Sequence, residues 1–285
     1  MEGIVLVRPN LPEEMSTALA GADGLITYLW DDKFLGNDLK WLQAISAGVD
    51  QFPLRRLGEA GIVVTSARGA HSPAVADHAI ALLLSLLRRI GPAVRRSVGH
   101  RWEPEIAHET DGLTVGVVGL GSIGEAVAQR LTGLGMNVMG VKRDPSAYQG
   151  VVKHVFGPDH LLRMFEECDA AILTLPSLPD TDRLITGRHF TALRGGWLVN
   201  VGRGSVLDEQ ALIEALSEGC IRGAALDVTV DEPLSDESPL WDMEQVIITP
   251  HMAWASDRLT PRLVEIVKAN LDAIRGVRPW VNRVM

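Results

Sequence analysis

The sequence predicts an α/β protein with two doubly wound parallel-sheet domains, and three observations support this fold class. Short apolar runs alternate with helix-length amphipathic segments almost from end to end. Such alternation is typical of parallel sheets covered by helices on both faces. The 285 residues suffice for two domains, since a domain usually takes roughly 100–200 residues. A glycine-rich turn also follows an apolar run near the middle of the chain.

The first part of the chain contains predicted buried strands and short helices, followed by one long helix. The long helix starts near Ser72-Pro73, runs through Arg89 and stops by Gly91-Pro92, because glycine and proline end helices. Its wide apolar face predicts burial, either between domains or against a second subunit. The preceding strands are predicted over residues 3–7, 24–28, 42–45 and 62–65, and the preceding helices over 12–20 and 54–60.

Predicted strands and helices then alternate again in the second part of the chain. Strands are predicted over residues 114–119, 137–141, 170–175, 197–201, 223–227 and 246–249, with helices over 125–134 and 261–274. The domain boundary is predicted near the long helix. This alternation alone leaves open which domain the final helix packs against.

The composition excludes several classes of protein. Hydrophobic residues make up 46% and charged residues 22%, the usual balance of a globular protein. The net charge of −9 provides no basic surface for nucleic acid. The longest apolar stretch, residues 79–87, is well short of a membrane span. The two cysteines form no CxxC pair, and the N-terminus does not resemble a signal peptide, so we expect no bound metal and a cytoplasmic location.

The central turn has the spacing of a dinucleotide-binding site. Gly119, Gly121 and Gly124 form a G-x-G-x-x-G pattern between a predicted strand and a predicted helix. The first glycine permits the tight turn, the second lets the backbone approach a pyrophosphate, and the third lets helix and strand pack closely. The N–H groups of Ser122, Ile123 and Gly124 at the helix N-terminus are then available to bind phosphate.

The end of the next strand indicates which dinucleotide binds. NAD-specific sites place an acid there for the ribose hydroxyls, but this chain has Lys142 followed by Arg143. Two cations at this place would attract the 2′-phosphate of NADP. Asp144 lies two positions beyond the place where the acid is expected, and it could bind the ribose hydroxyls of NAD instead. We therefore expect NADP as the preferred cofactor, with NAD as the alternative.

Three ionisable residues near the ends of later strands suit the reduction of a 2-keto acid. Arg203 lies between two glycines, Glu232 precedes a proline, and His251 follows one. An arginine binds a carboxylate through two parallel hydrogen bonds and polarises the carbonyl. A histidine can protonate the new alkoxide, and a carboxylate beside it would keep it charged and oriented. We assign these roles to Arg203, His251 and Glu232 in turn.

These motifs together resemble the D-isomer-specific 2-hydroxyacid dehydrogenase family over nearly the whole chain. The motifs that carry the resemblance span residues 46–50, 119–124, 175–181, 200–208, 226–233 and 250–253. The resemblance implies the same three roles for Arg203, His251 and Glu232. It also implies that Asp227 holds the nicotinamide carboxamide, and that Leu175, Pro176, Thr181 and Val201 lie on the cofactor side.

The resemblance further implies a domain organisation and a place for the substrate. Residues 1–71 and 257–285 would form a flavodoxin-like substrate domain, and residues 72–256 a Rossmann dinucleotide-binding domain. The backbone around Ala47 and Gly48 would hold the substrate carboxylate, and Trp254 would border the pocket. Homodimers are usual in the family, and the Lys142-Arg143 pair is similar to NADP-preferring glyoxylate and hydroxypyruvate reductases.

Two other functions are compatible with parts of this pattern. A dehydrogenase of another small anion, such as formate or phosphite, is one alternative, but formate enzymes pair their histidine with glutamine rather than with a glutamate such as Glu232. A dinucleotide-binding sensor or corepressor-like scaffold is the other, because such relatives can keep every catalytic residue. The sequence leaves the particular keto acid, the direction of the reaction, and the roles of Trp30 and Trp254 open.

Overall fold

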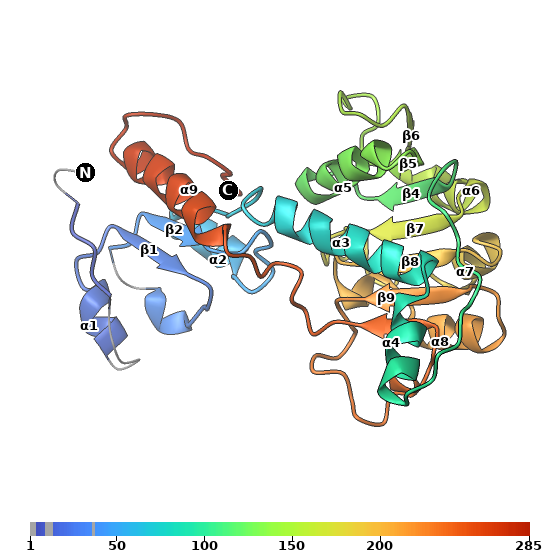
Figure 1. The fold of residues 1–285 in the computed structure, drawn as a ribbon. Coiled ribbons are helices and arrows are strands. Elements are labelled where there is room, and N and C mark those ends of the chain that lie inside the picture. Colours follow the sequence, from blue (N-terminus) through green and yellow to red (C-terminus); the bar gives the residue numbers. More distant parts are fainter. Residues whose placement is uncertain (1–3, 9–13, 36–37) are drawn as a thin grey trace. The chain divides into compact units, whose positions relative to one another are not determined.

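The computed structural model describes residues 4–8, 14–35 and 38–285. The described chain divides into two compact units (Figure 1). The smaller unit takes its residues from 1–71 and 257–285, and the larger unit spans 72–256. Each unit has a parallel sheet with helices, which confirms the predicted fold class. Within the described residues, no helix is both long and apolar enough to span a membrane.

The larger unit is built on a parallel sheet with the strand order of a Rossmann fold. The order is β10-β9-β8-β7-β4-β5-β6. The chain passes from β4 outward to β6 on one side, and then returns to β7 on the other side of β4. Ligands bind outside the carboxyl ends of the strands at such a reversal. The strands are β4 Thr114–Val118, β5 Asn137–Val141, β6 His154–Phe156, β7 Ala170–Leu173, β8 Trp197–Asn200, β9 Gly223–Leu226 and β10 Val246–Ile248.

Helices cover both faces of this sheet (Figure 1). Within β4, Val117 packs with α3 and α5 on one face, while Val118 packs with α6, α7 and α8 on the other. Both residues are fully buried, which explains why the strands read as continuous apolar runs. The helices are α3 Ser72–Leu87, α5 Ser122–Gly133, α6 Leu161–Glu167, α7 Gly187–Ala192 and α8 Glu209–Ser217, with short 3-10 turns at Pro158–His160, Gly204–Val206 and Pro239–Trp241.

The end of the long helix differs from the prediction in one respect. Helix α3 ends at Leu87, close to the predicted stop, and Arg89 adopts a left-handed backbone with φ of 54°. A further helix, α4 (Ile90–Val98), begins directly afterwards and was not predicted. Pro92 is tolerated there because the first turn of a helix needs no N–H donor. The strand β6 was also missed, since three residues carry too little pattern.

The smaller unit contains a three-stranded parallel sheet in its described residues, ordered β1-β2-β3. Helix α9 belongs to this unit, because Asn270 Nδ2 donates to Gln43 Oε1 at 2.7 Å. The C-terminal tail runs beside β3, where the Val284 N–H donates to the Val64 carbonyl oxygen at 2.8 Å. The elements are α1 Met15–Leu19, β1 Gly24–Thr27, a 3-10 turn Asp32–Phe34, β2 Trp41–Ala44, α2 Leu54–Glu59, β3 Val63–Thr65 and α9 Leu259–Ile274.

The predicted strand over residues 3–7 is wrong for the part that the structure describes. Residues 4–8 form no strand, and Val5 is 85% exposed; Gly3 lies outside the described residues. A strand needs hydrogen-bond partners along a neighbouring edge, and an apolar run does not specify them. Among the described residues, the sheet therefore ends at β1. Residues 12 and 13 of the predicted first helix also lie outside the described residues.

Candidate active site

The glycine turn after β4 has the backbone geometry that the sequence predicts. Gly119 has φ of 104°, which residues with a side chain rarely adopt. A Cβ on Gly124 would lie 2.2 Å from the Gly119 carbonyl oxygen, so the start of α5 contacts the turn backbone to backbone. A Cβ on Gly121, in contrast, would meet no protein atom within 4 Å. The open space at Gly121 and the unsatisfied N–H groups of the first helical turn fit a pyrophosphate.

Two residues that sequence reasoning missed connect this turn to the loops after β7 and β8. Thr174, directly after β7, donates its hydroxyl to the Gly119 carbonyl oxygen at 2.7 Å. Gly202 packs so closely that a Cβ there would lie 2.5 Å from the Leu175 carbonyl oxygen. The available signal was their position, since Thr174 precedes Leu175 and Gly202 precedes Arg203. The loops after β4, β7 and β8 are therefore packed against one another.

The predicted cofactor-side residues lie on these same loops. The Thr181 hydroxyl donates to the Pro176 carbonyl oxygen at 2.7 Å and closes the loop after β7. The Val201 N–H donates to the Leu173 carbonyl oxygen at 3.1 Å, which extends the pairing of β8 with β7. The structure thus brings Leu175, Pro176, Thr181 and Val201 to the carboxyl edge of the sheet, beside the glycine turn.

The two predicted cations after β5 have different surroundings. Lys142 folds back, and its Nζ donates to the Leu120 carbonyl oxygen at 2.8 Å, so its charge lies against the glycine turn. Arg143 is exposed and makes no side-chain hydrogen bond or ion pair with the described residues. Asp144 accepts hydrogen bonds from the Ser146 hydroxyl at 2.6 Å and the Ser146 N–H at 3.1 Å. These bonds hold the pKa of Asp144 below its usual value and engage it within its own loop.

Arg203 lies in a backbone segment that its neighbours fix tightly. Asn200 Oδ1 accepts from the Gly202 N–H at 3.0 Å, while Asn200 Nδ2 donates to the Arg203 carbonyl oxygen at 3.0 Å. A Cβ on Gly204 would lie 1.9 Å from the Thr229 carbonyl oxygen, so only glycine fits after Arg203. The half-buried Arg203 side chain therefore starts from a rigid position at the carboxyl end of β8.

His251 and Glu232 form a close pair in the same unit. His251 Nδ1 lies 2.7 Å from Glu232 Oε2. A carboxylate can only accept, so Nδ1 carries the hydrogen and Nε2 is left to face a ligand. The other Glu232 oxygen accepts from the Thr229 N–H at 3.3 Å, which orients the carboxylate. The structure brings together the predicted acid and its predicted partner, which are 19 residues apart in the sequence.

Asp227 lies beneath the loop that carries His251. It is 2% exposed, and its two oxygens accept from the Thr249 hydroxyl at 2.6 Å and from the N–H groups of Met252 and Ala253 at 3.0 Å each. Burial alone would raise the pKa of Asp227, but hydrogen bonds from His78, Thr249, Ala253 and Met252 outweigh it and lower the pKa. Asp227 is therefore held ionised and supports the loop, while its contact with nicotinamide stays a prediction.

The predicted substrate-side residues are divided between the units. Ala47 and Gly48 lie in the smaller unit, on a loop after β2 where the Ser46 hydroxyl donates to the Gly48 carbonyl oxygen at 2.7 Å. Trp254 belongs to the larger unit and has a half-exposed side chain. Trp30 packs edge-on against Phe34 within the smaller unit, with ring centroids 5.5 Å apart. Its contacts make Trp30 part of that unit's packing.

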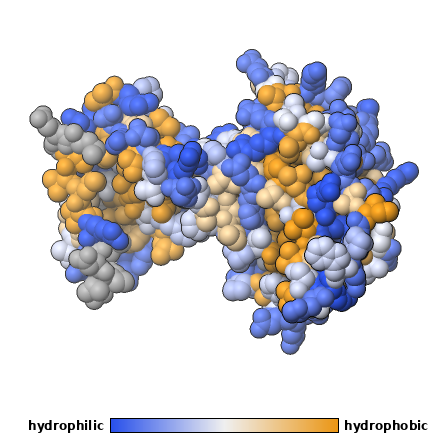
Figure 2. All heavy atoms as spheres, in the orientation of Figure 1, coloured by the Kyte–Doolittle hydropathy of each residue, from blue (hydrophilic) through white to orange (hydrophobic). Residues whose placement is uncertain are grey.

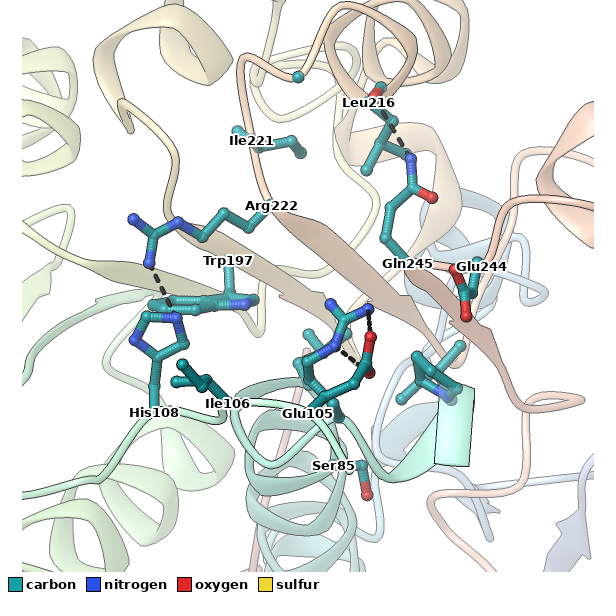
Figure 3. Close-up of a pocket in the computed structure, with 15 residues that line it drawn as sticks. Ser85, Glu105, Ile106, His108, Trp197, Leu216, Ile221, Arg222, Glu244 and Gln245 are labelled. Atoms are coloured by element: carbon teal, nitrogen blue, oxygen red, sulfur yellow. Dashed lines mark hydrogen bonds and ion pairs between the residues drawn. The ribbon is translucent and has the colours of Figure 1, made fainter. Parts of the chain in front are cut away.

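A cavity of about 710 Å³ in the larger unit lies at the edge of the sheet opposite the glycine turn, Arg203 and His251 (Figure 3). Trp197 begins β8, and Arg222 and Gln245 directly precede β9 and β10, so all three lie at the amino ends of their strands. Glu105 and His108 close the cavity from the segment after α4. The glycine turn, Arg203 and His251 follow carboxyl ends instead, so this cavity is separate from the candidate active site.

A glycine turn at a Rossmann switch point, with an arginine and a histidine–glutamate pair at the same sheet edge, defines a dinucleotide-dependent oxidoreductase. Comparison with known proteins agrees with this class. The family model "D-isomer specific 2-hydroxyacid dehydrogenase, NAD binding domain" matches residues 80–253. The chain belongs to the D-isomer specific 2-hydroxyacid dehydrogenase family.

Individual relatives cover most of the chain. A glyoxylate reductase of Korarchaeum cryptofilum is 33% identical over 247 residues, which are 83% of this chain and 73% of that protein. A glyoxylate/hydroxypyruvate reductase B of Yersinia pestis is 34% identical over 282 residues, 94% of this chain and 86% of the relative. The NADPH-dependent glyoxylate/hydroxypyruvate reductase of Sinorhizobium meliloti, solved with NADP and malonate, has a TM-score of 0.81 at 31% identity and covers 94% of this chain and 85% of its own.

The chain is therefore an enzyme that transfers a hydride between a nicotinamide dinucleotide and a small 2-keto or 2-hydroxy acid. The dinucleotide fits the residues present, because the open space at Gly121 and the N-terminus of α5 face the position that phosphates require.

Proposed function

We propose that this enzyme reduces a small 2-keto acid of the glyoxylate or hydroxypyruvate type to the D-2-hydroxy acid, with NADPH as its preferred reductant. The observation that carries the proposal is the His251–Glu232 pair at 2.7 Å, on the sheet edge that also holds Arg203 and the glycine turn. The names of the similar reductases agree with this choice of substrate.

Each of the three residues has a defined task in the proposed reaction. The Arg203 guanidinium binds the substrate carboxylate and polarises the C2 carbonyl. The glycine turn at Gly119, Gly121 and Gly124 would hold the dinucleotide, which would supply the hydride to C2. The His251 imidazolium donates its Nε2 proton to the C2 oxygen, which becomes the hydroxyl. Glu232 accepts the Nδ1 hydrogen bond and so keeps Nε2 directed at the substrate.

The substrate is tested directly with purified protein. We expect NADPH oxidation with glyoxylate and hydroxypyruvate at higher kcat/KM than with pyruvate or phenylpyruvate. The loss of NADPH absorbance measures the rate. A preference for phenylpyruvate would replace the small-acid proposal by a pocket for aromatic side chains. No turnover with any of the four acids, in a folded protein that binds NADPH, would favour a sensing role.

The cofactor preference rests on Lys142 and Arg143. With both replaced, as Lys142→Met and Arg143→Ala, we expect the KM for NADPH to rise about tenfold to hundredfold, because charge-assisted hydrogen bonds to the 2′-phosphate are lost. The KM for NADH should change little. The exposed Lys153 provides the control, since Lys153→Ala removes a nearby charge outside the proposed site. Equal losses for the two cofactors would contradict NADP selection by this pair.

We further propose that two copies of the chain form a dimer through the larger unit, while a cytoplasmic location stays a prediction of the sequence. Figure 2 shows hydrophobic side chains exposed on the face of the larger unit that carries α3 and α4. Exposed apolar residues recur at every fourth position through α4 and the segment after it: Ile90, Val94, Val98, Trp102 and Ile106. Trp102 is 98% exposed and Ile106 is 93% exposed.

This stripe is presented by a segment that is held firmly in place. Glu105 accepts hydrogen bonds from Arg96 at 2.7 Å and from Arg89 at 2.6 Å, which lower the pKa of Glu105 to about 2. Within α4 only Pro92 is buried, so the helix buries little apolar surface against its own unit. A buried tryptophan contributes about 200 Å², roughly a quarter of the ~800 Å² that a stable interface buries per partner. A second copy would cover the stripe symmetrically.

Sedimentation of matched variants tests the dimer. We expect the unaltered protein to sediment as a dimer, and the double variant Trp102→Ser with Ile106→Ser to sediment as a monomer at micromolar concentration. Val151→Ser, which removes an exposed apolar side chain elsewhere in the larger unit, should remain dimeric. A dimeric double variant would place the interface elsewhere, and a monomeric unaltered protein would refute the dimer itself.

A further inference from the structure

His78, on helix α3, contacts the polar residues beneath the His251 loop. Its Nε2 lies 3.0 Å from the Thr249 hydroxyl and 3.3 Å from Asp227 Oδ1. The Thr249 hydroxyl in turn donates to Asp227 Oδ1 at 2.6 Å. Because that hydroxyl spends its own hydrogen on Asp227, it can only accept from His78, so His78 Nε2 carries a hydrogen. The three side chains form a directed chain of hydrogen bonds that ends at Asp227.

Asp227 also binds the backbone around His251. Its carboxylate accepts from the N–H groups of Met252 and Ala253, and its carbonyl oxygen accepts from the His251 N–H at 2.8 Å. His251 itself has φ of 49°, in the left-handed region that disfavours residues with a side chain. Such a conformation persists only where surrounding contacts impose it. The contacts to Asp227 on both sides of His251 impose it here.

A carboxylate as deeply buried as Asp227 needs donors to remain charged. Two of its donors are backbone N–H groups of the loop itself, so they cannot hold the carboxylate independently of the loop. His78 and Thr249 are side-chain donors, and His78 comes from α3, which packs against β8 and β9. The helix therefore supplies the fixed point of the network.

We infer that His78 is a positioning residue for the proton donor His251. His78 donates a hydrogen bond to Thr249, Thr249 donates to Asp227, and Asp227 holds the His251 loop in place. The inference rests on the proposed role of His251 as the proton donor. His78 itself need not touch substrate or cofactor. Pro250, directly before His251, has no N–H to donate. The Thr249 hydroxyl is therefore the nearest donor to Asp227 on the N-terminal side of His251.

Isosteric variants test this role. We expect Thr249→Val, which removes only the hydroxyl, and His78→Phe, which removes the ring donor, each to lower kcat about tenfold. This is less than the ~10²-fold loss that a misplacement of about 1 Å can cause. Thr249→Ser and His78→Gln keep a donor and should restore most of the rate. The KM for NADPH should change much less than kcat in all four, whereas general loss of packing would alter kcat and KM alike.

A double variant separates positioning from a general structural effect. In the His251→Ala background, His78→Phe should cause no further loss of kcat, because residues that act as a unit are not additive. A further tenfold loss would overturn the inference, as would full activity of His78→Phe alone. Full activity of His251→Ala would instead refute the proposed function, so the two failures are distinguishable.

Discussion

His251→Ala is expected to lower kcat for 2-keto acid reduction by about 10²–10⁴-fold, the usual contribution of a general acid. The affinity for NADPH should stay nearly intact, because the lost interaction belongs to the transition state and not to the bound dinucleotide. Single-turnover kinetics with glyoxylate give the rate, and titration calorimetry with NADPH gives the affinity.

Glu232→Gln tests the partner of His251 in the same assays. It retains the size of the side chain at 2.7 Å from His251 Nδ1 but removes the charge that fixes the imidazole. We expect a smaller loss of kcat than in His251→Ala. Equal losses of NADPH affinity and kcat in His251→Ala would show that His251 supports cofactor binding, and would contradict its role as the acid.

Arg203→Lys is expected to lower kcat/KM by roughly 10²–10⁴-fold even though the charge is kept. Lysine cannot form the two parallel hydrogen bonds of a guanidinium with a carboxylate, and each bond to a charged group is worth about 1.5–3 kcal/mol. The rigid backbone at Gly202 and Gly204 prevents the segment from shifting to compensate. Steady-state kinetics over a range of glyoxylate concentrations measure the effect.

A surface arginine supplies the control for this substitution. Arg163 on α6 pairs with Glu167 at 2.7 Å and is exposed, so Arg163→Lys should leave kcat/KM within about twofold. If Arg203→Lys were as active as Arg163→Lys, the substrate carboxylate would have to bind elsewhere. The loop at Ala47 and Gly48 would then be the next candidate.

The glycine turn shows how much of the site a local sequence pattern can predict. The sequence predicts Gly119, Gly121 and Gly124 as a pyrophosphate cradle, because each glycine answers a short-range steric demand within six residues. The structure adds that Thr174 binds the turn from the end of β7, and that Gly202 packs against Leu175 beside it. A hydrogen bond across 55 residues of chain leaves no signal in local spacing.

The smaller unit shows where a pattern fails. The run at residues 4–7 is as apolar as the runs that become β1 and β3, yet it forms no strand among the described residues. Hydrophobicity predicts that a segment prefers burial, whereas strand formation also needs a free edge in register. The start of α4 was missed for another reason: Gly91-Pro92 was interpreted as a helix end, whereas Pro92 lies in the first turn of α4.

The sequence by itself determined the α/β class, the dinucleotide turn and the residue types that reduction requires, because these depend on short-range sterics and on the chemistry of single side chains. Only the tertiary structure decided the contacts that surround them. It placed His251 Nδ1 2.7 Å from its predicted partner Glu232, engaged Asp144 within its own loop, and joined His78 to Asp227 through Thr249. Parallel strands bring residues far apart in sequence to one sheet edge, and hydrogen bonds of fixed length then select the partners.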